Sequence, residues 1–179
     1  MPTPSATRLE HDLLGDKPVP ADAYYGVQTA RALENFHISG VQLRLYPNLI
    51  KAFAMVKMAA ARANVDCGQF SKEILSGIEG ACRELIDGKL HDEFRLDVFQ
   101  GGAGTSTNMN ANEVIANRAL ELMGHQKGEY KFCDPHDHVN QSQSTNDAYP
   151  SAIHVGLALG NAEIVAAFNQ LIEAFRAKG

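Results

Sequence analysis

Two short segments of this chain are rich in the small, hydroxyl-bearing residues that commonly bind anions. The first is residues 101–108, GGAGTSTN, which stands directly before a sequence of strong helical character. Glycine lets the backbone approach a ligand closely. The start of a helix adds unpaired N–H groups and a partial positive charge. Residues 101–108 therefore suggest a cradle for a small anion.

The second segment repeats this arrangement at the start of the last helical stretch. Residues 142–147, SQSTND, include Ser144, Thr145 and Asn146. Neither segment contains lysine or arginine. If the two segments converge, they would hold a small carboxylate through neutral donors, which leaves room for graded stabilisation of charge during a reaction.

The same residues can also be explained as helix caps. Thr107, Asn108 and Asn110 are all acceptable N-cap residues, and Asn110 with Glu113 has the spacing of a capping box, as has Ser144 with Asp147. Residues 101–108 are not a Walker-type phosphate-binding loop, G-x-x-x-x-G-K-[ST], because no lysine follows Gly104. They are not the dinucleotide-binding motif G-x-G-x-x-G either, because no βαβ pattern surrounds the segment. Composition alone leaves both the cap and the anion site open.

Other candidate chemistry is weaker. His136 and His138 stand beside Asp134 and Asp137, and together they could supply nitrogen and oxygen ligands to a metal. No second cluster completes such a site, so a solvated loop is favoured and no metal is expected. No nucleophile-and-base motif such as G-x-S-x-G is visible.

Composition limits the class of protein. The 179 residues are 45% hydrophobic, with a net charge of −5 and a sequence pI near 5.8, which argues against a nucleic-acid partner. Cys67, Cys82 and Cys133 are odd in number and far apart, which predicts no disulfide framework and fits a reducing cytoplasm. We expect neither an export signal nor an apolar stretch that reaches the roughly 18 residues of a membrane span.

The elements that must position these segments are mainly α-helical. Residues 1–26 contain several turn-forming residues and predict an extended arm or at most a short hairpin. Helical periodicity follows over residues 27–36, 47–65, 71–86, 110–124 and 147–178. The last of these helices is apolar around much of its circumference, which is typical of a helix buried among others. We therefore expect a truncated piece of a larger protein, or a subunit that buries this helix in an oligomer.

The two segments and their flanks resemble a known family. GGAGTSTNMNANEVIANRALELMG and HVNQSQSTNDAYPSAIHV are similar to the fumarase and aspartase superfamily, as are LLGDKPVPADAYYGVQTARALENFHISG near the start and GHQKGEY. Fumarate hydratases resemble GSGTQSNMN and SSND at the two segments, whereas Ala103 stands here in place of the hydratase serine. The pattern resembles the ammonia-lyase branch, which implies L-aspartate rather than malate as substrate.

This resemblance implies a fold and a site. The fold would be the family's N-terminal helical domain over residues 27–145, after an arm at 1–26, with residues 146–179 as the first helix of an incomplete central bundle. Thr105 would contact the substrate, Ser144 and Thr145 would bind the carboxylate next to the carbon that loses a proton, and Asn146 would lie near the amino group or the other carboxylate. The reaction would pass through an aci-carboxylate and need no cofactor.

The resemblance also implies what this chain lacks. The family's proton-abstracting serine lies on a loop resembling G-S-S-x-M-P-x-K-x-N-P, which does not occur among these 179 residues. Family members are homotetramers whose active sites draw on three subunits. We therefore expect the chain alone to be inactive. A fumarate hydratase fragment and a non-catalytic oligomerisation or binding module are the alternative interpretations.

Overall fold

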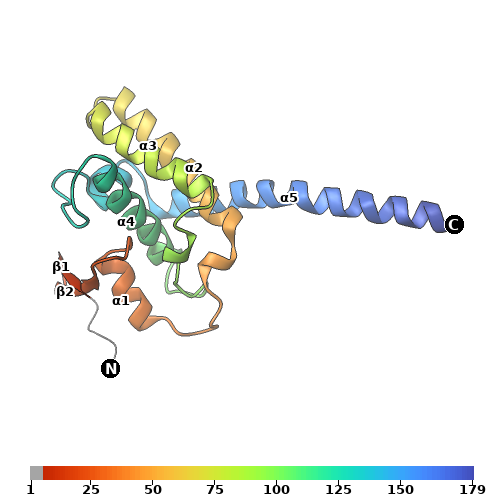
Figure 1. Cartoon of the computed structure of the whole chain (residues 1–179), viewed down its shortest axis with the longest axis horizontal. Helices are drawn as coiled ribbons and strands as arrows, with labels where there is room; N and C mark the ends of the chain where they lie inside the picture. Colours follow the sequence, from red (N-terminus) through yellow and green to blue (C-terminus); the bar gives the residue numbers. More distant parts are fainter. Residues whose placement is uncertain (1–5) are drawn as a thin grey trace.

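The computed structural model describes residues 6–179, so the first five residues of the expected arm lie outside the described part. In this part a β-hairpin precedes a helical body from which one long helix extends (Figure 1). The strands are β1 (Thr7–Asp12) and β2 (Gly15–Pro20); the α-helices are α1 (Val27–Asn35), α2 (Pro47–Asp66), α3 (Lys72–Ile86), α4 (Thr105–Leu122) and α5 (Thr145–Lys178). Two 3₁₀ turns, η1 (Leu43–Leu45) and η2 (His91–Glu93), and one π turn, η3 (Pro135–Val139), complete the elements. The prediction of a mainly α fold is confirmed.

The expected short hairpin is present. β1 and β2 pair antiparallel, with Arg8 opposite Val19. The Arg8 guanidinium then donates to the carbonyls of Ala23 and Tyr25, each at 2.7 Å. These bonds bind the segment that leads into α1, so the arm lies against the body.

Local signals set the ends of the next helices as predicted. Pro47 occupies the first turn of α2, where its missing N–H has no consequence. The Ser71 hydroxyl caps α3 by accepting the Ile74 N–H at 3.3 Å. Gly68 and Gly88, at φ +74° and +92°, follow α2 and α3, as expected of helix C-termini.

Helix α4 is the centre of the core. Its residues from Thr107 to Asn117 are all buried, and α1, α2, α3 and α5 all contact it. The prediction that this helix begins at Asn110 is wrong, because it begins five residues earlier at Thr105, with Gly104 as N-cap. Asparagine usually favours caps over helix interiors, but here the amide nitrogens of Asn108, Asn110 and Asn117 donate tertiary hydrogen bonds that offset that preference.

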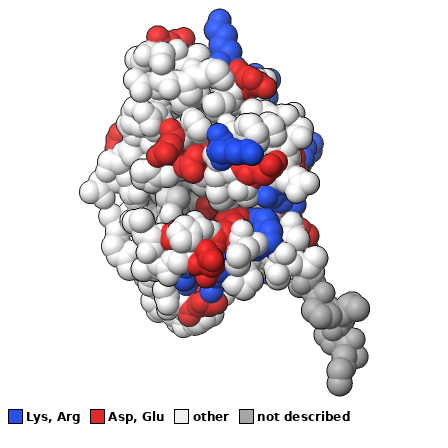
Figure 2. Space-filling model, turned by 90° about the vertical axis from the view of Figure 1, so that its left-hand side faces the viewer, with Lys and Arg blue, Asp and Glu red and all other residues white. Residues whose placement is uncertain are grey.

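Most charged side chains lie at the periphery of this body, with Lys57 and Glu113 among the buried exceptions. Figure 2 shows acidic and basic groups interspersed on the face opposite the free end of α5. Arg118 illustrates the pattern, since it forms salt bridges with Glu84 at 2.6 Å and with Glu121 at 2.9 Å. On this face neither sign of charge predominates.

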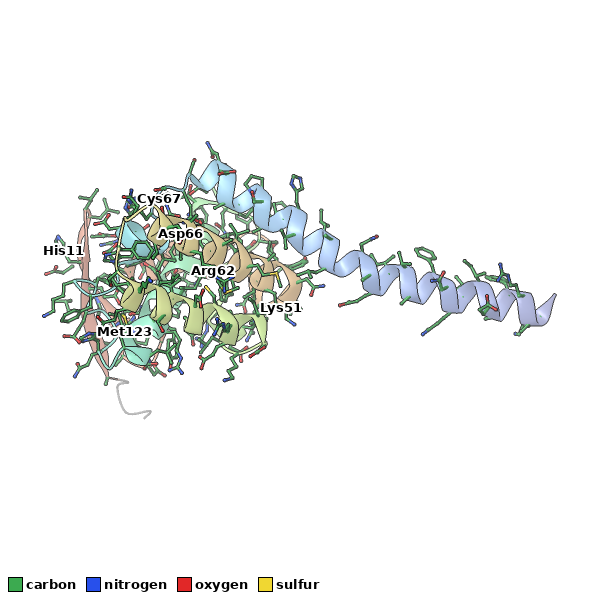
Figure 3. All side chains as sticks on the ribbon, turned by 90° about the horizontal axis from the view of Figure 1, so that it is seen from above. His11, Lys51, Arg62, Asp66, Cys67 and Met123 are labelled. Atoms are coloured by element: carbon green, nitrogen blue, oxygen red, sulfur yellow. The ribbon has the colours of Figure 1, made fainter. Side chains whose placement is uncertain are left out.

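Helix α5 leaves the body after its first three turns (Figures 1 and 3). Only Ala148, Ala152 and Gly156 of its residues are buried. Beyond them its large apolar side chains are exposed: Leu157, Ile164, Val165, Phe168, Leu171, Ile172 and Phe175. An 18-residue window of α5 has a mean hydropathy of 1.4, so by length and composition it could cross a membrane, contrary to the expectation from sequence. A core helix of a helical bundle has the same composition, so this is weak evidence for a membrane span.

Candidate functional site

The start of α4 depends on glycine at position 104. Gly104 has φ +84°, a left-handed conformation that strains other residues. A Cβ there would also lie 2.6 Å from ring atoms of Tyr149, which belongs to the second turn of α5. The glycine therefore allows the starts of the two helices to lie in contact.

Gln100 fixes the first turn of α4 from the preceding loop. Its side-chain oxygen accepts the Thr107 N–H at 2.9 Å, and its amide nitrogen donates to the Thr107 hydroxyl at 2.7 Å. Within residues 6–179 the N–H groups of Thr105 and Ser106 have no hydrogen-bond partner. Thr105 is exposed, so these N–H groups and the Thr105 hydroxyl can meet a ligand from solvent.

Ser144 caps α5 as its spacing predicts. Its hydroxyl oxygen accepts the Asn146 N–H at 3.1 Å, and its carbonyl accepts the Asp147 N–H at 3.1 Å. The second bond of a capping box, from the Ser144 N–H to the Asp147 side chain, is not formed among the described residues. Because the Ser144 hydroxyl accepts one bond from within the helix, its proton can be donated outward.

One side-chain bond joins the two segments directly. The amide nitrogen of Asn108, in the first turn of α4, donates to the hydroxyl oxygen of Thr145 at 3.1 Å. Thr145 therefore also accepts a bond from the protein and retains its own proton for a ligand. Thr105, Ser144 and Asn146 are exposed at the same two helix starts, with no hydrogen bond from one to another in the described part of the chain.

A polar cluster that sequence reasoning missed lies beneath these helix starts. The Asn140 side-chain oxygen accepts bonds from Lys57 Nζ at 2.8 Å, Asn108 Nδ2 at 3.0 Å and Asn112 Nδ2 at 3.2 Å. Lys57 is fully buried, and burial lowers its pKa to about 7. A sequence signal existed, because Lys57 lies four residues from both Phe53 and Ala61 and so falls on the apolar face of α2.

Glu113 has a different role from the predicted one. It lies inside α4 and accepts the backbone N–H groups of Gly26, Gln28 and Thr29 at 2.9, 2.8 and 3.1 Å. Burial raises the pKa of Glu113 to about 7, although these hydrogen bonds act in the opposite direction. The capping-box interpretation of Asn110 and Glu113 is wrong, because Glu113 caps α1, a distant helix, rather than its own.

Two of the residues considered as metal ligands, Asp134 and His138, have structural roles. Asp134 caps η3 by accepting the His136 and Asp137 N–H groups at 2.6 and 2.8 Å. His138 Nδ1 accepts the Asp134 N–H at 2.8 Å. Among residues 6–179 no group of three or more His, Cys, Asp or Glu side chains is arranged to hold a metal ion.

Comparisons with known proteins identify the family of this chain. The sequence model of the family described as Lyase matches residues 15–179. Aspartate ammonia-lyase from Pseudomonas aeruginosa is 58% identical over 98% of this chain and 37% of its own length. The Escherichia coli K12 aspartate ammonia-lyase is 52% identical over 96% of this chain and 36% of its own length. The chain thus spans little more than a third of the length of these curated relatives.

Solved structures show the same relationship. The fumarate lyase:delta crystallin from Brucella melitensis, solved with bound cobalt, superposes with a TM-score of 0.95 at 53% identity, over 97% of this chain and 38% of that one. Class II fumarase from Schistosoma mansoni superposes with a TM-score of 0.81 at 39% identity, over 86% of this chain and 32% of that one. With its sequence and fold in agreement, this chain belongs to the lyase family that includes the aspartate ammonia-lyases and class II fumarases.

Proposed function

We propose that this chain is the N-terminal part of an L-aspartate ammonia-lyase, which converts L-aspartate to fumarate and ammonia. Two comparisons support the ammonia-lyase branch over the hydratase branch. Identity is 52–58% to the two aspartate ammonia-lyases and 39% to the class II fumarase. Ala103 also departs from the serine of the hydratase motif.

The observation that carries the proposal is the bond from Asn108 to Thr145, which holds the starts of α4 and α5 together. In the proposed site the Thr105, Ser144 and Thr145 hydroxyls donate to one substrate carboxylate. Asn146 lies near the amino group or the other carboxylate. Two helix starts facing one ligand add N–H groups and partial positive charge to these hydroxyls.

The chemistry explains why these groups are neutral. Removal of the C3 proton places a second negative charge on the adjacent carboxylate, which becomes an aci-carboxylate. Donors whose hydrogen bonds become stronger as this species forms stabilise the transition state more than the ground state. The C2–N bond then breaks, its electron pair leaves with the nitrogen, and the C2–C3 double bond of fumarate forms.

The base that removes the proton would come from outside these 179 residues, because the serine-loop motif does not occur in them. We further propose the division into an arm (1–26), a helical domain (27–145) and a bundle helix (146–179). The complete protein would be a cytoplasmic homotetramer in which α5 is covered by other bundle helices. This arrangement accounts for the apolar side chains that α5 exposes here.

A chimera tests this function. This chain would replace the matching segment of the Pseudomonas aeruginosa aspartate ammonia-lyase, which aligns over 175 residues. We expect the chimera to form fumarate from L-aspartate, followed by its ultraviolet absorbance, while the isolated 179-residue chain forms none. Hydration of fumarate to malate without ammonia release would indicate a hydratase instead. A folded tetrameric chimera with neither activity would contradict the proposal and favour a non-catalytic module.

A further inference from the structure

Lys57 is unusual because it is a fully buried lysine without a carboxylate partner. It has 0% exposure in the middle of α2, and no salt bridge joins it to any Asp or Glu among residues 6–179. Burying a cation in this way costs free energy. By contrast, Lys51 and Arg62, on the same helix, are at least partly exposed (Figure 3). If position 57 contributed only apolar packing, methionine would be the more stabilising residue there.

Its hydrogen bond leads to the connection between the two helix starts. Lys57 Nζ donates to the Asn140 side-chain oxygen at 2.8 Å, and Asn108 Nδ2 donates to the same oxygen at 3.0 Å. Asn108 Nδ2 also donates to the Thr145 hydroxyl oxygen. On its other side, Asn140 Nδ2 donates to the Gln143 carbonyl at 2.9 Å, one residue before Ser144.

We infer that Lys57 is a positioning residue that, through Asn140, fixes the start of α5 against the start of α4 and so sets the placement of the Thr145 hydroxyl. The expected effect of Lys57 on enzyme activity rests on the proposed function. The structural part of the inference concerns the segment 140–145 and can be tested separately.

Lys57 is not the only residue of α2 that binds this segment. Asn64, two turns further along α2, donates to the Gln141 carbonyl at 2.8 Å. A Lys57→Met variant therefore keeps one link from α2 to the segment and loses a buried charge. We expect it to remain folded, with a melting temperature equal to or above that of the parent.

The surroundings of Lys57 also predict a pH dependence. The groups that face it are the thiol of Cys82 on α3 and the neutral amides of Asn108, Asn112 and Asn140. Burial lowers the pKa of Lys57 to about 7, and Cys82 partly opposes this. Below pH 7 the buried charge therefore lowers the free energy of unfolding by its full amount. This penalty declines as the pH rises toward the ordinary lysine pKa. Any gain in stability from Lys57→Met should be larger at pH 6 than at pH 9.

The test uses the chimera with Lys57→Met, and with Lys51→Met as the matched control on the same helix. Hydrogen exchange followed by mass spectrometry should show amides 142–147 exchanging about tenfold faster in Lys57→Met and unchanged in Lys51→Met. The kcat/KM for L-aspartate should fall about 100-fold at pH 6, mainly in kcat, because misplaced donors weaken transition-state stabilisation most. The loss should shrink as the pH rises from 6 to 9, because the parent lysine loses charge over this range and a neutral amine donates to Asn140 more weakly than an ammonium group does.

Two results would overturn the inference. One is unchanged exchange over residues 142–147 in Lys57→Met. The other is a lowered melting temperature with faster exchange along the whole of α2, which would mean a general packing role. If the parent chimera proves inactive, the proposed function fails, and the exchange measurement alone still decides the role of Lys57.

Discussion

At the scale of single residues, the site depends on positions where local and tertiary requirements coincide. Gly104 must adopt a positive φ and must also leave room for the ring of Tyr149. The glycine-rich sequence indicates the first requirement. Nothing local indicates the second, because Tyr149 lies 45 residues away in the chain. The pairing of Lys57 with Asn140 escaped sequence reasoning for the same reason, because it is a long-range contact, although the place of Lys57 on the apolar face of α2 was a local signal.

The two requirements at Gly104 can be separated by substitution. Gly102 has a similar φ of +73°, but a Cβ added there would meet no other atom within 4 Å, so Gly102→Ala carries backbone strain alone. Its expected cost is about 1 kcal/mol of unfolding free energy. Gly104→Ala adds the clash with Tyr149 and should cost about 2–3 kcal/mol more. Urea unfolding of the chimera carrying each variant checks this, and equal losses would contradict the proposed contact.

At the scale of elements, the sequence predicted the helices well and their tertiary roles poorly. The ends of α2 and α3 follow from Pro47, Ser71, Gly68 and Gly88, whose effects are local. The start of α4 does not, because its buried asparagines have the sequence character of caps. The amide nitrogens of Asn108, Asn110 and Asn117 donate to groups far away in the sequence, and no sequence period reveals such partners.

Glu113 gives a direct test of such a distant cap. Its two carboxylate oxygens accept three N–H groups at the start of α1. Glu113→Gln replaces one acceptor oxygen with an NH₂ group that must face an N–H donor. The substitution should lower the free energy of unfolding by about 2–3 kcal/mol. Glu163→Gln, on the exposed part of α5, serves as the control and should have no measurable effect. Thermal unfolding of the two chimera variants measures the difference, and equal stability would contradict the assigned role.

At the scale of the whole molecule, α5 determines how the chain behaves. Its apolar periodicity predicted a helix that needs partners, and the structure shows those side chains exposed over residues 157–175. Sequence could not show where the helix leaves the body. At Gly156 helix α5 is still closely packed against α2, because an added Cβ there would lie 3.3 Å from the Asn48 carbonyl oxygen. The end of this long-range packing sets the point where α5 leaves the body.

The exposed part of α5 should make the isolated chain associate. An apolar surface of this extent is unfavourable in water, so we expect dimers or larger species in analytical ultracentrifugation at micromolar concentration. Replacing Phe168 and Phe175 with Glu should shift the chain to monomer. The control is Leu13→Glu with Leu14→Glu at the exposed hairpin tip, which should leave association unchanged. A monomeric parent chain that binds no apolar dye would contradict this expectation.

In the proposed function, the starts of α4 and α5 form one binding site for a substrate carboxylate. The most direct measurement is a crystal structure of the tetrameric chimera with bound fumarate. We expect one carboxylate within hydrogen-bond distance of the Thr105, Ser144 and Thr145 hydroxyls, with the bond from Asn108 to Thr145 retained. Fumarate bound elsewhere, with both helix starts occupied only by water, would contradict it.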